Sequence, residues 1–421
     1  MRVLIAGGGI GGLSLALSLL DAGITDIEVF ESARAMRELG VGINVLPHAT
    51  RELDELGLRG ALEAVAIPTA ELSYYTKRGQ RIWSEPRGLA AGYRWPQFSI
   101  HRGDLLGLLH RAVVARLGEA RIHTGHHLLR FADRAEGGIR AEFGPAVGEP
   151  TRAIADGDLL VGCDGVHSVV RAALYPDEGP PRWNGITMWR GTTVSAPFLG
   201  GRTMIMAGYF RRRVVVYPIS RRHEAEGRSL INWVAEHQTA EGQPMPRQDW
   251  EYRASVEEAV APFADYRFDF LDVPALMRGA DAVYRYPMVD RDPLPTWNAG
   301  RVTLLGDAAH PMYPVGSNGA SQAILDARVL ARELVLQPYI EDALAAYDAA
   351  RRPATAAVVL ANRAVGPEQC MEIVEARAPD GFTDLDAIIS PDELAAISAG
   401  YKQKAGFDPA LLNNRPSLSV R

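Results

Sequence analysis

Residues 2–31 read RVLIAGGGIGGLSLALSLLDAGITDIEVFE, and this stretch decides the fold of the N-terminal part of the chain. The apolar runs 2–6 and 26–30 are predicted to be buried strands, and 13–22 is predicted to be a helix between them. A strand, a helix and a second strand in this order form a β-α-β unit, because parallel strands need a crossover connection. The sequence therefore predicts a parallel sheet with helices packed on it.

A glycine pattern, Gly7-x-Gly9-x-x-Gly12, connects the first strand to the helix. Gly7 allows a tight turn, Gly9 lets the backbone approach a pyrophosphate, and Gly12 permits close packing of the helix on the sheet. The helix N-terminus offers N–H groups and a favourable dipole to phosphate. Glu31, at the end of the second strand, can accept hydrogen bonds from ribose hydroxyls. A glycine turn without a ligand is the alternative, but these features together favour a dinucleotide site.

Two later segments place an aspartate and a glycine where an apolar strand meets a helix. They are Asp164-Gly165, after a strand predicted over 159–163, and Gly306-Asp307, after a strand predicted over 302–305. Such an aspartate can accept from a ribityl or ribose hydroxyl, or it can cap the helix. The helix N-terminus at 319–322 can direct its dipole at a flavin carbonyl edge or a phosphate. With the glycine pattern, these segments favour FAD over NAD.

This order of motifs resembles the class A FAD-dependent aromatic hydroxylases, the salicylate and para-hydroxybenzoate hydroxylase family, over roughly residues 1–362. The resemblance implies an α/β protein with a Rossmann-like FAD-binding domain, a substrate domain on a mixed central β-sheet, and C-terminal helices. It also implies non-covalent FAD, NADH or NADPH as a transient co-substrate, and O2 activation as a C4a-hydroperoxide of the flavin. The implied FAD contacts are Gly7, Gly9, Gly12, Glu31, Val41, Gly42, Arg102, Leu128, Asp164, Asp307, Gly316, Asn318, Gly319 and Ala320.

Five segments narrow the resemblance to the subfamily of 5-methylphenazine-1-carboxylate 1-monooxygenases, which decarboxylate and hydroxylate a phenazine. These segments are 39–44, 83–88, 99–103, 185–191 and 286–295. Ser317-Asn318 and Leu325 depart from the wider family but are similar to this subfamily. The stretch 207–213 and the segment after about 366 diverge from it. The substrate therefore stays open between a phenazine and another planar aromatic, and so does decarboxylation.

Short runs rich in β-branched and aromatic residues between about 185 and 234 predict an antiparallel sheet that covers one face of the nucleotide domain. A flat pocket for a small aromatic substrate is predicted there. Its expected lining is Met188, Trp189, Arg190, Met204, Met206, Tyr209 and Tyr217, with Pro314 from a later loop. In alternating strands such residues are more often plain core. Arg190 or the run 211–213 is predicted to steer an anion, with a solvated turn as the alternative for the run.

No side chain is predicted to be a catalyst, because the flavin performs the oxygen chemistry. The charge balance of 45 Lys+Arg against 51 Asp+Glu gives −6 and argues against a general nucleic-acid binder. Two cysteines and the absence of an HExxH motif argue against a disulfide framework and a metal site. No run approaches the roughly 18 apolar residues of a membrane helix, and glycines interrupt the N-terminal apolar stretch. A cytoplasmic enzyme without membrane or nucleic-acid partners is expected, and a homodimer stays open.

The predicted domain organisation is discontinuous. The FAD-binding domain takes 1–70, 101–180 and 286–362, the substrate domain takes the hairpin 71–100 and the sheet 181–285, and 363–421 forms a helical tail. Two other functions stay open: an FAD-dependent epoxidase, halogenase or antibiotic-modifying hydroxylase, and a non-catalytic nucleotide-fold binding protein. The intact Asp-Gly and Gly-Asp motifs argue against the binding protein.

Overall fold

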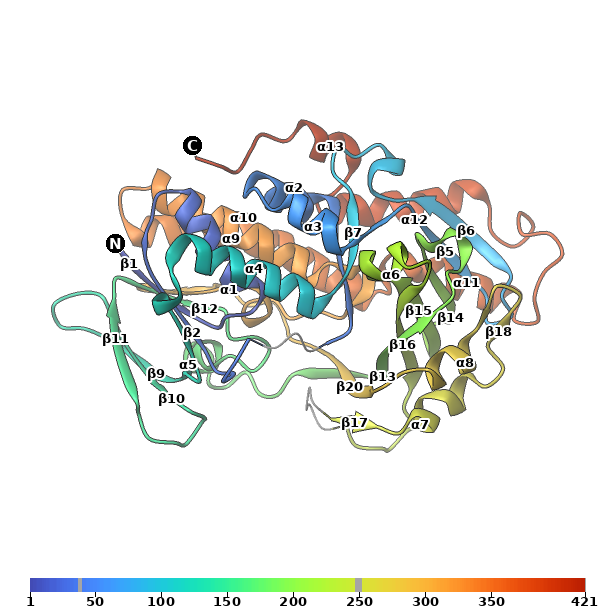
Figure 1. Cartoon of the computed structure of the whole chain (residues 1–421), viewed down its shortest axis with the longest axis horizontal. Coiled ribbons are helices and arrows are strands. Elements are labelled where there is room, and N and C mark those ends of the chain that lie inside the picture. Colours follow the sequence, from blue (N-terminus) through green and yellow to red (C-terminus); the bar gives the residue numbers. More distant parts are fainter. Residues whose placement is uncertain (37–39, 247–251, 421) are drawn as a thin grey trace.

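The computed structural model describes residues 1–36, 40–246 and 252–420. Two large sheets lie towards opposite ends of an elongated molecule, and long helices run between them (Figure 1). These helices are α9 (Gly319–Leu336) and α10 (Ile340–Arg363). None of the helices in the described ranges is both long and apolar enough to cross a membrane.

The first large sheet is the parallel sheet predicted from the N-terminal stretch. Its six strands lie in the order β21 (Asn298–Ala299), β22 (Val302–Leu304), β12 (Leu159–Gly162), β1 (Arg2–Ala6), β2 (Asp26–Glu31) and β8 (Ile122–Thr124). All neighbours pair in parallel except β21 with β22. The carboxyl ends of parallel strands share one edge, and ligands bind outside that edge in open α/β sheets. The fold therefore gathers the segments that follow β1, β2, β12 and β22.

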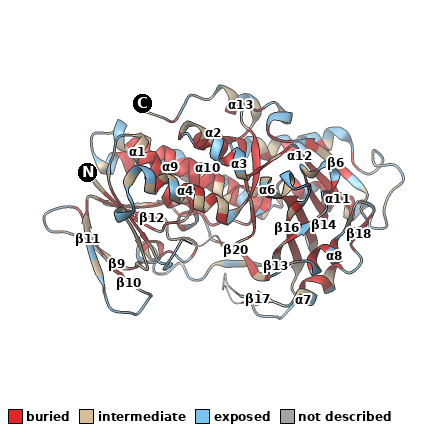
Figure 2. Cartoon of the chain, viewed as in Figure 1, coloured by how far each residue is buried: buried red, intermediate tan, exposed pale blue. Residues whose placement is uncertain are grey.

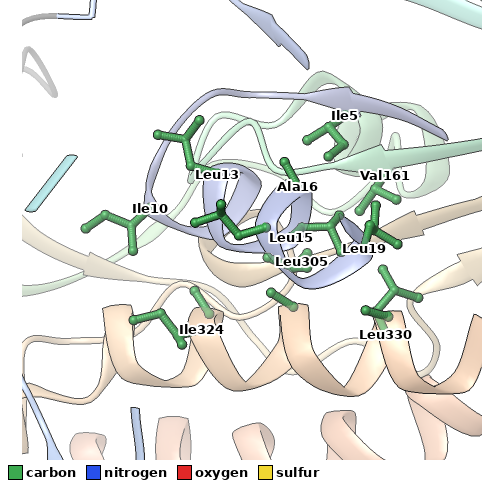
Figure 3. Close-up of a cluster of buried hydrophobic side chains, with 14 of the residues drawn as sticks. Ile5, Ile10, Leu13, Leu15, Ala16, Leu19, Val161, Leu305, Ile324 and Leu330 are labelled. Atoms are coloured by element: carbon green, nitrogen blue, oxygen red, sulfur yellow. The ribbon is translucent and has the colours of Figure 1, made fainter. Parts of the chain in front are cut away.

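Helix α1 (Ile10–Asp21) is buried between this sheet and α9. Side chains on all of its sides are apolar, which suits a helix that is covered all round. Leu13, Ala16 and Leu19 of α1 lie in one cluster with Ile324 and Leu330 of α9 (Figure 3). Figure 2 shows both helices buried along most of their length. This packing fixes two helix N-termini relative to the sheet edge.

The second large sheet is mainly antiparallel and lies over the other end of α9. Its eight strands follow the order β17 (Arg253–Ala254), β20 (Val283–Asp290), β13 (Arg182–Ser195), β16 (Ser229–Gln238), β15 (Arg212–Pro218), β14 (Thr203–Tyr209), β5 (Glu71–Tyr75) and β6 (Arg81–Pro86). Only β14 and β5 pair in parallel. One face, here called the inner face, packs on the C-terminal helices, and the outer face is covered by α7 (Val256–Val260) and α8 (Val273–Arg278). The antiparallel sheet predicted between about 185 and 234 and the hairpin predicted within 71–100 are both present.

Smaller elements complete the fold. Three small sheets are formed by β3 (Gly42–Val45), β7 (Gln97–His101) and β4 (Ile67–Thr69), by β9 (His127–Asp133), β10 (Ile139–Gly144) and β11 (Ala153–Gly157), and by β18 (Arg267–Phe268) and β19 (Leu271–Asp272). The remaining helices are α2 (Pro47–Glu55), α3 (Arg59–Val65), α4 (Arg102–Leu117), α5 (Val169–Leu174), α6 (Arg221–Ala225), α11 (Gln369–Arg377), α12 (Pro391–Lys404) and α13 (Pro409–Asn414). The sequence did not predict β9–β11, and α13 lies near the end of the chain. That end is held because Arg51 of α2 donates to the Leu412 carbonyl at 3.3 Å.

Candidate functional site

In the glycine loop after β1, the packing of the chain itself requires Gly7 and Gly12 but not Gly9. Gly7 has φ +112, and a Cβ there would lie 2.2 Å from the Cys163 carbonyl oxygen. A Cβ on Gly12 would lie 1.9 Å from the Gly7 carbonyl oxygen. A Cβ on Gly9 would meet no atom of the described chain within 4 Å. Gly9 therefore leaves open space beside the N-terminus of α1, where a helix can bind a phosphate.

Glu31, at the end of β2, holds the glycine loop in place. Its two carboxylate oxygens accept from Gly8 N at 2.8 Å and Ala33 N at 2.7 Å. The segment leading to Leu128 follows this strand end, since His126 N donates to the Glu31 carbonyl at 2.8 Å, and Leu128 itself is buried in the core. Sequence reasoning assigned Glu31 to ribose alone, whereas the structure shows that it also orders the loop.

Asp164 caps a helix and still has one free oxygen. Its Oδ2 accepts from Val169 N at 2.7 Å and Val170 N at 3.3 Å, at the start of α5. Its Oδ1 is buried and has no hydrogen-bond partner in the described structure. Burial raises the pKa of this carboxyl, although Ser168 and backbone N–H groups lower it. The capping alternative is realised, and an orphaned acceptor remains for a ligand hydroxyl.

Arg102 and Asp307 border a hollow inside the fold. Both side chains are exposed by accessible surface. Protein nevertheless surrounds them closely enough that burial lowers the pKa of Arg102 and raises the pKa of Asp307. The charges of Asp307, Arg190 and Glu31 all act on Arg102, so the hollow extends from β2 to the second sheet. Three features fit a long anionic cofactor such as FAD. They are the open space beside Gly9, the unpaired Oδ1 of Asp164 and the guanidinium of Arg102.

The loop that leads into α9 is clamped by the C-terminal helix α12. Gly316 has φ +65, and a Cβ there would lie 2.1 Å from the Tyr401 hydroxyl. Asn318 Nδ2 donates to that hydroxyl at 2.9 Å, and Pro314 is exposed at the start of the loop. Helix α9 then begins at Gly319 and Ala320 with no side-chain cap from its N-cap residue. Its first N–H groups are therefore available to a ligand.

Val41 and Gly42, in contrast, are buried, and the Val41 carbonyl accepts from Arg102 N at 2.9 Å.

Two buried residues that sequence reasoning missed support the Gly306-Asp307 turn. Asp326 accepts from Gly306 N at 3.2 Å and from His310 and Arg351. Arg171, from the Asp164 segment, donates to the Ala309 carbonyl at 2.7 Å. The two aspartate motifs are thereby tied together. Asp326 and Arg171 are charged residues in otherwise apolar stretches that follow the two motifs. This pattern could have identified them in the sequence, because buried charges are normally paired.

Four of the predicted pocket residues lie together on the inner face of the second sheet. Met188, Met204, Met206 and Tyr217 share one cluster. Arg190, on the same strand face as Met188, donates to the Gly42 carbonyl at 2.7 Å, and its Nε is buried without a partner among the described residues. Burial, opposed by Arg190, raises the pKa of Tyr217 to about 12. This face and the Arg102 hollow meet at Arg190.

Other predicted residues are not brought to this face. Trp189 lies on the outer face and its indole donates to Glu258 at 3.2 Å, because successive strand residues alternate. Tyr209 lies at the end of β14 with Lys77 over its ring at 5.6 Å. Anion steering by 211–213 is not supported, since Arg212 pairs with Asp265 and the buried Arg213 pairs with Glu236 and Glu368. The solvated-turn alternative is wrong for Arg213.

A small cavity of about 20 Å³, room for about one water molecule, lies between the inner face, the loop at Gly316 and α12. Its apolar walls include Leu72, Met204 and Met206. Its polar residues are Tyr74, Glu85, Arg87, Gln97, Ser317, Ser398, Tyr401 and Lys402. This volume is far below the roughly 300–1,000 Å³ of small-molecule sites. The segment 83–88 contributed to the family resemblance, but the sequence predicted no role for Glu85 or Arg87.

Comparison with known proteins agrees with this geometry. The model of a family described as "FAD binding domain" matches residues 1–362. Phenazine 1,6-dicarboxylic acid hydroxylase PhzS of Lysobacter antibioticus is 47% identical, over 86% of this chain and 89% of the relative. The 3-amino-4-hydroxybenzoate 2-monooxygenase PtnB3 of Streptomyces platensis is 34% identical, over 78% of each.

Among solved structures, Klebsiella pneumoniae HpxO complexed with FAD and uric acid superposes with a TM-score of 0.74. It is 23% identical and the match covers 98% of this chain and 97% of that one, so it shows a shared fold. The family match over most of the chain and the relatives above 30% identity go further. This chain belongs to the FAD-binding domain family and is an FAD-dependent aromatic monooxygenase.

Proposed function

We propose that this enzyme hydroxylates a planar, electron-rich aromatic acid of the phenazine type, with NADH or NADPH as reductant and O2 as co-substrate. The observation that carries the proposal is the methionine-rich inner face, which lies beside the hollow bordered by Arg102 and Asp307. Methionines provide flat, adaptable apolar contacts for fused rings. The phenazine hydroxylase relative supports the same substrate class.

The chain's own residues would bind, orient and exclude water. Gly9 and the N-terminus of α1 would hold the diphosphate of non-covalent FAD, and Asp307 would accept from a ribityl or ribose hydroxyl. The uncapped N-terminus of α9 would stabilise negative charge on the reduced cofactor. Bound FAD would supply the electrophilic oxygen that attacks the ring. Met204 and Met206 would pack against the ring and keep water from it.

A coupled assay tests this proposal. We expect phenazine-1-carboxylate or phenazine-1,6-dicarboxylate to stimulate NAD(P)H oxidation, with a product that gains one oxygen atom, with or without loss of CO2. Hydroxybenzoates should stimulate less, because a single ring covers less of the methionine-rich inner face. Stimulation by an alkene or an aliphatic amine alone would contradict the aromatic substrate and leave the FAD assignment intact.

We further propose that the enzyme acts in the cytoplasm and that the chain divides as its sequence predicts. The FAD-binding domain would comprise 1–70, 101–180 and 286–362, and the substrate domain 71–100 and 181–285. Limited proteolysis with and without FAD would test this division, since FAD should protect only linkers that border the first domain. Light scattering would decide between a monomer and a homodimer.

A further inference from the structure

The loop that enters α9 holds two successive residues in the left-handed region of backbone conformation. Gly316 has φ +65 and Ser317 has φ +58. Glycine adopts this conformation readily, but a residue with a side chain does so only when its surroundings hold it there. The loop 314–318 therefore depends on contacts from the rest of the chain, and its position sets where α9 begins.

A buried hydroxyl, that of Tyr401 in α12, holds this loop. It accepts from Asn318 Nδ2 at 2.9 Å and lies 3.2 Å from the Val315 carbonyl. It also donates to Asn362 Oδ1 at 2.9 Å, and Asn362 Nδ2 donates to the Tyr313 carbonyl at 2.9 Å. Burial raises the pKa of Tyr401, so its hydroxyl stays protonated and can both donate and accept. One hydroxyl and its amide partner thus hold both ends of the loop.

Asn318 is the N-cap residue of α9, but its side chain does not cap the helix. An asparagine at this position usually accepts from an N–H group of the first turn. Here Nδ2 donates to Tyr401 and to the Gly316 carbonyl at 3.2 Å, and Oδ1 accepts from Gln322 Nε2 at 3.3 Å. Gln322 is held in turn by Arg351, which donates to its Oε1 at 2.6 Å. The amide of Asn318 is therefore engaged away from the N–H groups of its own helix.

The uncapped start of α9 lies at the cofactor hollow. A Cβ on Gly319, the first residue of α9, would lie 3.9 Å from Asp307 Oδ1, and Asp307 borders the hollow with Arg102. A helix N-terminus stabilises negative charge, and a flavin gains negative charge when it is reduced. N–H groups that already have an acceptor would contribute less to this effect.

We infer that Tyr401 is a positioning residue for the flavin. Through Asn318 it holds the loop in its left-handed conformation and keeps the start of α9 uncapped at the cofactor hollow. This inference rests on the place that the proposed function gives to the N-terminus of α9 beside the reduced cofactor. Tyr401 lies beyond residue 362, where the family match ends, so the C-terminal helix α12 contributes to the redox properties of the site.

The midpoint potential of the bound flavin tests this role without substrate or turnover. It would be measured against a reference dye for wild type, Tyr401→Phe, Asn318→Ala, the double variant and Tyr266→Phe. Tyr401→Phe removes the hydroxyl and keeps the ring that packs against Gly316. Tyr266 is the matched control, because it is equally buried and its hydroxyl donates to the Arg212 carbonyl at 2.8 Å on the outer face of the second sheet.

We expect Tyr401→Phe to weaken the binding of reduced FAD about threefold to tenfold more than the binding of oxidised FAD, because Asn318 is released to cap α9. For a two-electron couple this ratio lowers the midpoint potential by about 15–30 mV. In the Asn318→Ala background, Tyr401→Phe should have no further effect, since alanine cannot cap the helix. Tyr266→Phe should reduce the stability of the apoprotein to urea about as much as Tyr401→Phe does, but should leave the potential unchanged.

An unchanged potential in Tyr401→Phe would overturn the inference, because the residue would then serve the fold alone. An equal shift in Tyr266→Phe, or the same shift with and without Asn318, would overturn it as well. If Tyr401→Phe does not fold, Asn318→Ser should have a lower potential than Asn318→Ala, because serine can cap α9 and is too short to reach Tyr401. Equal potentials of these two variants would contradict the inference. Failure of the proposed function is a distinct result: the potentials would follow this pattern while no phenazine is oxidised.

Discussion

Gly9 and Gly12 lie in the same turn but have opposite surroundings. Gly12 is required by the protein itself, because any Cβ would overlap the Gly7 carbonyl. Gly9 has φ −73, which any residue can adopt, and open space where its Cβ would be. Glycine suits this N-cap position of α1, and the open space beside it leaves room for a ligand. This difference separates a residue that serves the fold from one that serves the cofactor.

The two glycines should therefore respond differently to alanine. We expect Gly12→Ala to destabilise the protein without cofactor by about 3 kcal/mol, since overpacking against backbone cannot relax. Gly9→Ala should cost about 1 kcal/mol of that stability or less, because alanine is a poorer N-cap than glycine, and it should weaken FAD binding. Urea unfolding of the apoprotein and fluorescence titration with FAD measure the two effects. Normal FAD affinity in a folded Gly9→Ala variant would remove this glycine from the site.

Asp307 is the second residue whose role is a ligand contact. It makes none of the capping bonds that Asp164 makes, although both follow a buried strand. We expect Asp307→Ala to raise the dissociation constant of FAD about 10- to 100-fold, from the loss of a charge-assisted hydrogen bond worth about 1.5–3 kcal/mol. Removing this charge should not lower apoprotein stability, because Asp307 caps no helix. Asp265→Ala, which breaks an exposed pair with Arg212, serves as the control and should bind FAD normally.

At the scale of elements, the loop before α9 depends on a buried ion cluster behind it. Arg213 of β15 pairs with both Glu236 of β16 and Glu368, so two carboxylates share one guanidinium. Glu368 also accepts from Gly316 N at 3.4 Å. Burial raises the pKa of Glu368 to about 7, against the opposing effect of Arg213. Protonation of this carboxyl thus changes the charge of a cluster that touches the flavin-side loop.

The raised pKa predicts a pH dependence with a definite sign. The folded protein holds the Glu368 proton more tightly than the unfolded chain, so this contribution to stability is fully present below about pH 4.5 and lost as pH rises through about 7. Relative to wild type, Glu368→Gln should therefore gain stability as pH increases from 5 to 7.5, by up to about 1.4 kcal/mol per pH unit. Urea unfolding across this range measures it. Glu375→Gln, which breaks the pair with Lys77, serves as the control and should follow the wild-type profile. If Glu368→Gln also followed the wild-type profile, the raised pKa would not belong to Glu368.

Sequence patterns predicted the elements whose signal is local. The strands and the helix around the glycine loop and the hairpin of β5 and β6 were found because apolar periodicity and turn residues mark them. The sheet β9–β11 was missed, since its strands are short and their exposed residues blur the alternation. Trp189 was placed on the wrong face because a list of aromatic residues ignores strand register. Arg87 and Lys402 meet only through tertiary packing over 315 positions, which no local pattern records.

The whole molecule joins two sheets through α9, and the site lies where they meet (Figure 1). The parallel sheet provides strand ends and helix N-termini for the cofactor, as open α/β sheets do. The antiparallel sheet provides a broad apolar face, and the C-terminal helices close its open side. Tyr401 connects these parts, since its hydroxyl contacts Asn318, Asn362 and the Val315 carbonyl. Cofactor loop, central helix and cavity wall therefore form one connected unit.

The most direct test of this account is the origin of the oxygen atom in the product. Turnover of phenazine-1-carboxylate by the FAD-loaded enzyme would be run with NAD(P)H under isotopically labelled oxygen gas, and the product mass and NAD(P)H consumption would be measured together. We expect one labelled oxygen atom in each product molecule and one NAD(P)H oxidised for it. Product oxygen that carries no label, or NAD(P)H oxidation that yields only hydrogen peroxide with every aromatic acid tried, would contradict it.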